Sequence, residues 1–189
     1  MFRWLSLAIL LMAVGTSGYY RRHARKSETI ARSREGALFV ALRLLVTLPL
    51  LLAIVAYIVN PSWMAWATLD MPDWMRWAGV ALGALTIPAV FWVFRNIGRN
   101  VSETVLTKRD HQLVTTGPYR WIRHPLYTTG SVLLLSIGLM HASWFVLLLA
   151  GVAACLIRLV VIPIEERALV EKFGDRYRAY MDGTGGMLP

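Results

Sequence analysis

Residues 127–164, YTTGSVLLLSIGLMHASWFVLLLAGVAACLIRLVVIPI, decide the fold, because Arg158 is the only residue among Asp, Glu, Lys and Arg in this run of 38 residues. A helix that crosses a bilayer needs about 20 apolar residues, so the run is long enough for two. Its midpoint, from His141 to Trp144, is the expected hinge. The run therefore predicts a hairpin of two short transmembrane helices.

Three further apolar regions precede it, at Phe2 to Tyr20, Gly36 to Asn60 and Trp74 to Phe94. The sequence thus predicts an all-α integral membrane protein with five transmembrane helices. Of the residues, 57% are hydrophobic and 16% are charged, where soluble domains average about 25% charged. This composition excludes a disordered chain and an ordinary soluble domain.

The first apolar region allows one alternative, a signal peptide, since Arg3 precedes the apolar core and residues 15–18 are small and polar. The basic cluster at residues 21–26 argues against it, because such a cluster resists translocation.

The basic residues predict the orientation in the membrane. Residues 21–35, 95–126 and 165–189 hold 16 of the 20 Lys and Arg residues, whereas the loop from Pro61 to Asp73 holds none. The positive-inside rule places the three basic segments in the cytosol. The net charge of +9 is therefore a feature of topology, and no nucleic-acid partner is expected.

Neither cysteine nor histidine predicts a metal site. Cys155, the single cysteine, lies in an apolar run, so no disulfide or cysteine ligand set is expected. His111 and His124 are separated by a long stretch of loop with no recognisable zinc spacing.

The loop before the last apolar run carries the first candidate site. A β-prone strip from Gln112 to Thr116 leads into a Gly-Pro turn, and Arg123 and His124 stand just before Pro125, which suits the first turn of a helix. Free N–H groups at that helix start, with the two cationic side chains, predict a site for an anionic group such as a carboxylate. The neighbouring aromatic side chains offer faces for a planar ring or a cation: Tyr119, Trp121 and Tyr127.

The segment after the apolar run carries the second candidate site. Glu165 and Glu166 stand where the last helix leaves the membrane, and two adjacent carboxylates there require a cation. The candidate cations are Arg123, Arg158, Arg167 or a positively charged ligand. Arg158 lies seven residues before Glu165, and this spacing places both side chains on one face of a regular helix. The spacing of Leu169, Phe173, Tyr177 and Tyr180 predicts an amphipathic helix on the membrane surface.

Together the two segments resemble a known family. The string Gly-x-Tyr-x-x-x-Arg-His-Pro-x-Tyr spans residues 117–127, and Glu-Glu-x-x-Leu-x-x-x-Phe-Gly-x-x-Tyr-x-x-Tyr spans residues 165–180. Both resemble motifs of the isoprenylcysteine carboxyl methyltransferase family and the related phospholipid methyltransferases, in the same order. The resemblance covers residues 111–180, and the first three apolar regions match only in being apolar.

The resemblance implies an integral membrane methyltransferase that uses S-adenosyl-L-methionine on the cytosolic side. Residues 1–189 would form one membrane domain, with three transmembrane helices in residues 1–94 and a catalytic half in residues 95–189. The acceptor would be a lipophilic small molecule or a prenylated one, and the implied reaction is methylation of the carboxylate of an isoprenylated cysteine or an analogue. The implied cofactor contacts are His111, Gln112, Leu113, Val114, Tyr119, His124, Pro125, Leu126, Tyr127 and Glu166. For catalysis we expect Arg158 or Arg123 to pair with the carboxylate of the acceptor, and Glu165 to orient the cofactor or the acceptor.

Two departures bear on the acceptor. Family members that methylate prenylcysteine tend to carry an arginine one turn before the paired glutamates, and this chain has Val161 at that place. Those members also tend to end in a basic Val-Pro tail, whereas residues 181–189 of this chain read MDGTGGMLP. Methylation of a phospholipid amine or of a small thiol is the alternative on the same scaffold. A membrane reductase is another alternative, but the sequence lacks a GxGxxG motif after a strand. A non-enzymatic anchor would leave both motifs unexplained.

Overall fold

The computed structural model describes residues 1–25, 37–97 and 113–188. Within these ranges every regular element is helical, which confirms the predicted all-α fold. The elements are α1 (Phe2–Arg25), α2 (Ala37–Val59), η2 (Pro61–Ala67), α3 (Asp73–Ile97), η4 (Gly117–Arg120), α4 (Pro125–His141), α5 (Trp144–Leu156), η5 (Ile157–Val161), α6 (Ile162–Phe173) and α7 (Asp175–Asp182).

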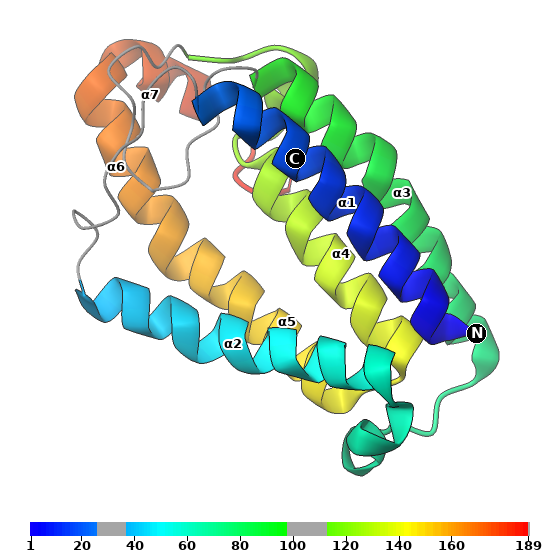
Figure 1. Ribbon diagram of the computed structural model, residues 1–189. Coiled ribbons are helices and arrows are strands. Elements are labelled where there is room, and N and C mark those ends of the chain that lie inside the picture. The colour runs from blue at the N-terminus through cyan, green and yellow to red at the C-terminus, as the bar shows by residue number, and fades with distance from the viewer. Residues whose placement is uncertain (26–36, 98–112, 189) are drawn as a thin grey trace.

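The helices lie roughly along one direction, as expected for membrane spans. Figure 1 shows α1, α3 and α4 side by side, with α2 near the start of α5. The main buried cluster joins four helices and η2 through Ile9, Leu50, Met64, Ile137 and Val146. The C-terminal end of α1, the end of α3, the start of α4, and α6 with α7 gather at the opposite end of the molecule from the N-terminus (Figure 1).

Among the residues that the structure describes, four helical stretches are long and apolar enough to cross a bilayer: residues 2–23, 40–59, 73–97 and 144–173. The fifth predicted span corresponds to α4, which has 17 residues. That length is at the lower limit for a membrane-crossing helix, so five spans remain a prediction. After α4, Ala142 adopts a left-handed conformation (φ 48°), and Ser143 caps α5 by accepting a hydrogen bond from the Val146 N–H.

Two glycines let α3 approach α4 closely. A Cβ atom added at Gly79 would lie 2.8 Å from the Ser136 carbonyl oxygen and 2.8 Å from Leu139 Cβ. At Gly83, one turn later, a Cβ would lie 3.0 Å from Ser136 Oγ. Small residues four apart on a membrane helix permit such backbone contact. This helix pair holds the start of α4 beside the end of α3.

Arg76 closes the end of the bundle that contains the N-terminus. Its Nε and Nη2 atoms each donate a hydrogen bond of 3.2 Å to the Met140 carbonyl oxygen, one of the last carbonyl groups of α4. Its guanidinium also lies 3.9 Å from the centre of the Phe2 ring and donates to Tyr57 Oη. The arginine therefore satisfies a helix terminus while it joins α1, α2, α3 and α4.

The last membrane helix is longer than the predicted short one. The helical run continues from Trp144 through η5 to Phe173 without interruption. η5 is a π-helical turn, in which the Ile162 N–H donates to the Ile157 carbonyl oxygen. Such a turn holds one residue more than an α-helical turn. Arg158 and Glu165 consequently lose the common face that a spacing of seven gives in a regular helix.

The predicted surface helix through Leu169, Phe173, Tyr177 and Tyr180 is not one helix. Gly174 separates α6 from α7 with φ 58° and ψ −131°, a conformation that only glycine adopts without strain. The chain changes direction there. Leu169 and Tyr177 are consequently both buried, instead of lying on a membrane surface.

We expect Gly79→Ala to lower the free energy of unfolding by about 1–3 kcal/mol, because the new methyl group would collide with the backbone of α4. Thermal unfolding in detergent measures the effect. Gly15→Ala in α1 is the matched control, since nothing lies within 4 Å of its added Cβ. Equal melting temperatures for both variants would contradict the close α3–α4 contact.

Candidate active site

His124 lies between the two adjacent carboxylates. Its Nε2 atom is 3.2 Å from Glu166 Oε1, and its Nδ1 atom is 3.7 Å from Glu165 Oε2. Tyr127, one turn into α4, donates a hydrogen bond of 2.9 Å from its hydroxyl to Glu165 Oε2. The two sequence motifs therefore meet in space, at the junction of α4 and α6.

Arg123 binds the second carboxylate and the end of the chain. Its Nε donates to Glu166 Oε1 at 2.8 Å, and its Nη1 donates to the carbonyl oxygens of Met181 and Thr184. The side chain is only 14% exposed. Its guanidinium is thus engaged within the protein on two sides.

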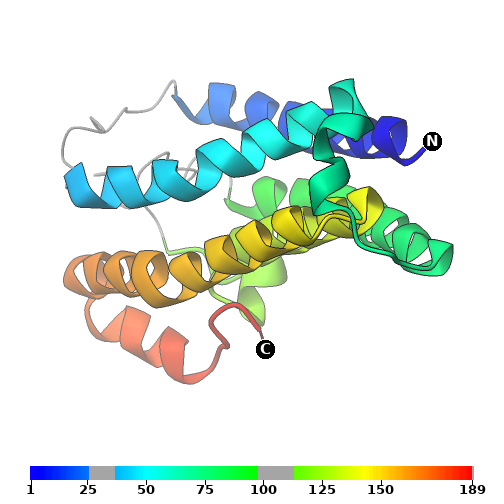
Figure 2. The same cartoon turned by 90° about the horizontal axis from the view of Figure 1, so that it is seen from below.

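The C-terminal segment 184–187 runs back across the loop before α4, as Figure 2 shows. The backbone N–H groups of Arg123 and His124 donate to the carbonyl oxygens of Gly185 and Gly186, at 2.9 and 3.1 Å. In return the Gly185 N–H donates to the Trp121 carbonyl oxygen, and Thr128 Oγ1 donates to the Met187 carbonyl oxygen at 2.6 Å. The segment is therefore a wall of the site that consists largely of backbone.

The two glutamates differ in environment. Glu166 is 17% exposed and contacts both Arg123 and His124, so its charge is compensated inside the protein. Glu165 is 29% exposed and contacts Tyr127 and, at a longer distance, His124. A partly exposed carboxylate thus remains at the surface of an otherwise well-paired cluster.

Two tyrosines fix the elements around this cluster. Tyr180, in α7, donates a hydrogen bond of 2.5 Å from its hydroxyl to the carbonyl oxygen of Tyr119, in η4. Burial raises the pKa of Tyr180 to about 12, although the nearby Arg123 lowers it. Burial also raises the pKa of Tyr119. Both phenols therefore stay neutral hydrogen-bond donors near neutral pH.

The other residues predicted to contact the cofactor differ in burial and in secondary structure, and two of them are not described. Leu113 and Val114 are half-buried and have no regular structure, so the predicted β-prone strip is not a strand in its described part, residues 113–116. Pro125 is buried at the start of α4, and Leu126 packs against Val90 and Phe94 of α3. His111 and Gln112 lie outside the described residues.

The predicted anion site at the start of α4 needs a correction. The cationic side chains expected there, Arg123 and His124, bind the protein's own Glu166, and their backbone N–H groups bind the carbonyl oxygens of the C-terminal segment. The side chains that were expected to bind an anion thus bind a carboxylate of the same chain.

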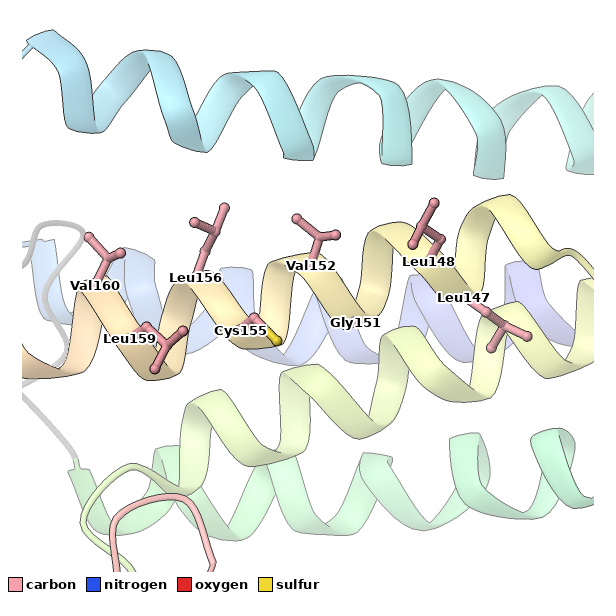
Figure 3. A pocket seen from close by; sticks show the side chains of 8 residues that line it. All are labelled: Leu147, Leu148, Gly151, Val152, Cys155, Leu156, Leu159 and Val160. Atoms are coloured by element: carbon pink, nitrogen blue, oxygen red, sulfur yellow. The ribbon is translucent and has the colours of Figure 1, made fainter.

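Arg158 is not brought into the cluster. It is exposed in η5, and no hydrogen bond or ion pair joins it to any other residue that the structure describes. Beside it a hollow of about 430 Å³ follows α5 and η5 and has an apolar lining. Figure 3 shows Leu148, Val152, Leu156 and Val160 pointing from this helix toward α2. A lone cation thus borders an apolar surface at membrane depth.

Sequence reasoning missed the residues that hold the site together. The roles of Thr128 and of the two glycines at 185 and 186 depend on contacts between distant segments, for which no local pattern exists. Tyr177 and Tyr180 had a sequence signal, since they belong to the second motif, but helical periodicity placed them on a membrane surface.

Comparison with known proteins identifies the relatives of this chain. The sequence model of the phospholipid methyltransferase family matches residues 74–176, which is more than half of the chain. The uncharacterized protein YpbQ of Bacillus subtilis (strain 168) is 28% identical over 94 residues, 49% of this chain and 56% of that protein. The cobalt-zinc-cadmium resistance protein CzcN of Cupriavidus metallidurans (strain ATCC 43123 / DSM 2839 / NBRC 102507 / CH34) is 33% identical over 82 residues, 43% of this chain and 38% of that protein. The chain therefore matches less than two thirds of either relative.

A solved structure shares the fold. The eukaryotic intramembrane Ras methyltransferase ICMT (isoprenylcysteine carboxyl methyltransferase) superposes with a TM-score of 0.58 at 20% sequence identity, over 82% of this chain and 53% of ICMT. The resemblance that the two motifs indicated is therefore confirmed at the level of family and fold.

We expect Arg123→Ala to speed hydrogen exchange at the Gly185 amide by about tenfold or more. Hydrogen bonds to a charged group contribute about 1.5–3 kcal/mol each, and tenfold corresponds to about 1.4 kcal/mol. Exchange read by mass spectrometry over residues 181–187 measures the change.

Arg120→Ala is the matched control for that measurement, because Arg120 is exposed and lies over the Trp121 ring at 4.7 Å. Identical exchange in the two variants would show that Arg123 does not hold the C-terminal segment.

Proposed function

We propose that this chain, which belongs to the phospholipid methyltransferase family, is a membrane-embedded enzyme that transfers a methyl group from S-adenosyl-L-methionine to a lipophilic acceptor. The site would face the cytosol, as the distribution of basic residues predicts. Family membership favours methyl transfer over reduction by a nicotinamide cofactor.

The observation that carries the proposal is the unequal pairing of Glu165 and Glu166. Arg123 compensates the charge of Glu166 and His124 contacts it, whereas Glu165 has a phenol as its nearest partner and keeps the greater exposure. A carboxylate beside aromatic rings would attract a cation. A sulfonium is such a cation, and a reduced nicotinamide is not.

The residues present fit this cofactor in other respects. The aromatic side chains of Tyr119, His124 and Tyr127 are held by hydrogen bonds or burial, so they form a rigid surround for a ligand. Leu113, Val114, Pro125 and Leu126 would supply the apolar part of the same surround. When bound, S-adenosyl-L-methionine supplies an electrophilic methyl group attached to its sulfonium sulfur.

The protein's own contribution is positioning and exclusion of water. Glu165 would orient the cationic part of the cofactor, while Glu166 and Arg123 would keep α6, the loop before α4 and the C-terminal segment in fixed relation. The paired charges of Arg123 and Glu166 and the backbone of the C-terminal segment would exclude water from one side of Glu165, which would strengthen its attraction for a cation.

For the acceptor we propose the carboxylate of an isoprenylated cysteine or a molecule of similar shape. Of the two arginines considered for that carboxylate, Arg158 is the better candidate, because the guanidinium of Arg123 is already engaged. The apolar hollow next to Arg158 would take the lipid chain. A carboxylate acceptor is already a nucleophile and needs no general base.

A phospholipid amine is the second candidate acceptor, favoured by Val161 at the place of the family's arginine. An amine must lose a proton, and Glu165 is the carboxylate placed to accept it.

We expect Glu165→Gln to weaken binding of S-adenosyl-L-methionine by about tenfold or more and binding of S-adenosylhomocysteine much less. Only the first ligand carries the sulfonium charge, and tenfold is about 1.4 kcal/mol. Calorimetry with purified protein in detergent measures both constants. Glu171→Gln, an exposed carboxylate on the same helix, is the matched control. An equal loss for both ligands would contradict the electrostatic role of Glu165.

We expect methyl transfer from labelled cofactor to a farnesyl-cysteine analogue to give a base-labile methyl ester. Arg158→Ala should raise KM for that acceptor about tenfold with little change in cofactor affinity. A stable N-methyl or S-methyl product on another acceptor, with no ester formed, would assign the alternative acceptor. An unchanged KM would remove Arg158 from the acceptor site.

A further inference from the structure

Tyr177 carries a buried hydroxyl group that has no hydrogen-bond partner among the residues that the structure describes. The side chain is only 1% exposed and is among the largest fully buried side chains of the protein. A buried polar group without a partner costs free energy, so native structures rarely keep one without a reason. Tyr177 therefore requires an explanation beyond packing.

The position of this side chain is fixed from both sides. Gly174 turns the chain between α6 and α7, and the Tyr177 N–H donates to the Gly174 carbonyl oxygen in the first turn of α7. On the other side, the Tyr177 ring contacts the Tyr180 ring edge-to-face at 5.9 Å, and Tyr180 is bonded to Tyr119. The ring of Tyr177 is thus packed inside the protein, while its hydroxyl has no hydrogen bond of its own.

The charged groups of the candidate active site act on that hydroxyl. Burial raises the pKa of Tyr177, the Glu166 carboxylate raises it further, and the Arg123 guanidinium lowers it. Tyr177 is therefore a neutral phenol beside the compensated pair of Arg123 and Glu166. A neutral phenol offers an O–H donor, and its natural partner is an oxygen acceptor.

Two neighbouring tyrosines use their hydroxyls in contacts within the protein. Tyr127 donates to Glu165, and Tyr180 donates to the Tyr119 carbonyl oxygen. Both of these hydroxyls therefore have a hydrogen-bond acceptor within the protein. The hydroxyl of Tyr177 makes no such contact within the described part of the chain.

We propose that Tyr177 is a cofactor-binding residue, whose hydroxyl donates a hydrogen bond to an oxygen atom of bound S-adenosyl-L-methionine. This inference rests on the proposed function. The oxygen atoms of that cofactor are those of its carboxylate and its ribose, and either accepts from a phenol. The contact would add α7 to the binding site, in addition to the loop before α4 and α6.

Tyr177→Phe tests the proposal, because it removes only the hydroxyl. In the ligand-free protein we expect an equal or higher melting temperature, since a buried group without a partner is lost. We expect the Kd for S-adenosylhomocysteine, which keeps the carboxylate and the ribose, to rise about tenfold. Stability and affinity should thus change in opposite directions, which a merely structural role does not produce.

Tyr180→Phe is the matched control, because its hydroxyl has a protein partner, and we expect a lower melting temperature for the ligand-free protein. A similar fall in Tyr177→Phe would show that the hydroxyl has a partner in the protein and would overturn the proposal. An unchanged Kd in Tyr177→Phe, with clear binding by the natural sequence, would also overturn it. Failure of the natural sequence to bind S-adenosylhomocysteine would instead defeat the proposed function, and this inference with it.

Discussion

The two adjacent carboxylates at the start of α6 are the constraint on which the rest of the site depends. Glu165 and Glu166 follow an apolar helix of thirteen residues and a π-helical turn, in a region where an unpaired charge is costly. Arg123 and His124 compensate Glu166, and they stand on another segment that must therefore be brought to α6. Much of the fold provides this approach. The close α3–α4 contact at Gly79 and Gly83 fixes α4 against α3. The contacts of His124 and Tyr127 with the two glutamates then join the start of α4 to α6.

The pairing of Arg123 with Glu166 also fixes the C-terminal segment beside the site. The guanidinium of Arg123 has donors to spare after it binds Glu166, and it uses them on the carbonyl oxygens of Met181 and Thr184. The following residues, Gly185 and Gly186, bring no side chains, so their backbone can pair directly with that of the loop. One ion pair consequently serves two purposes. It makes buried charge tolerable, and it attaches the end of the chain as a wall beside the remaining carboxylate.

The sequence allowed prediction of the parts that local chemistry dictates. The all-α fold followed from the apolar runs, and the meeting of Arg123 and His124 with the paired glutamates followed from the motif resemblance. Prediction failed where a single residue changes a helix: the left-handed Gly174 divides the expected surface helix, and the π-helical turn at Ile157–Val161 displaces Arg158 from the face of Glu165. Helical periodicity assumes regular turns, so it contains no information about either. The backbone partners of Arg123 were unpredictable for another reason, because they are carbonyl groups of a segment about sixty residues away.

The same arrangement bears differently on the proposed cofactor and on the proposed acceptor. The paired side chains around Glu166 depend on one another, since removal of one partner leaves a buried charge, and a change at any of them is expensive. Arg158 has no partner among the described residues and borders an apolar hollow, so the residues around it can change without leaving a charge unpaired elsewhere. The proposed acceptor surface on α5 and η5 can therefore differ between relatives while the cluster at the start of α4 stays the same. This independence accounts for a chain that keeps both motifs yet has Val161 where prenylcysteine methyltransferases tend to carry an arginine. Acceptor specificity in this family is accordingly expected to lie along the membrane helix and not in the loop.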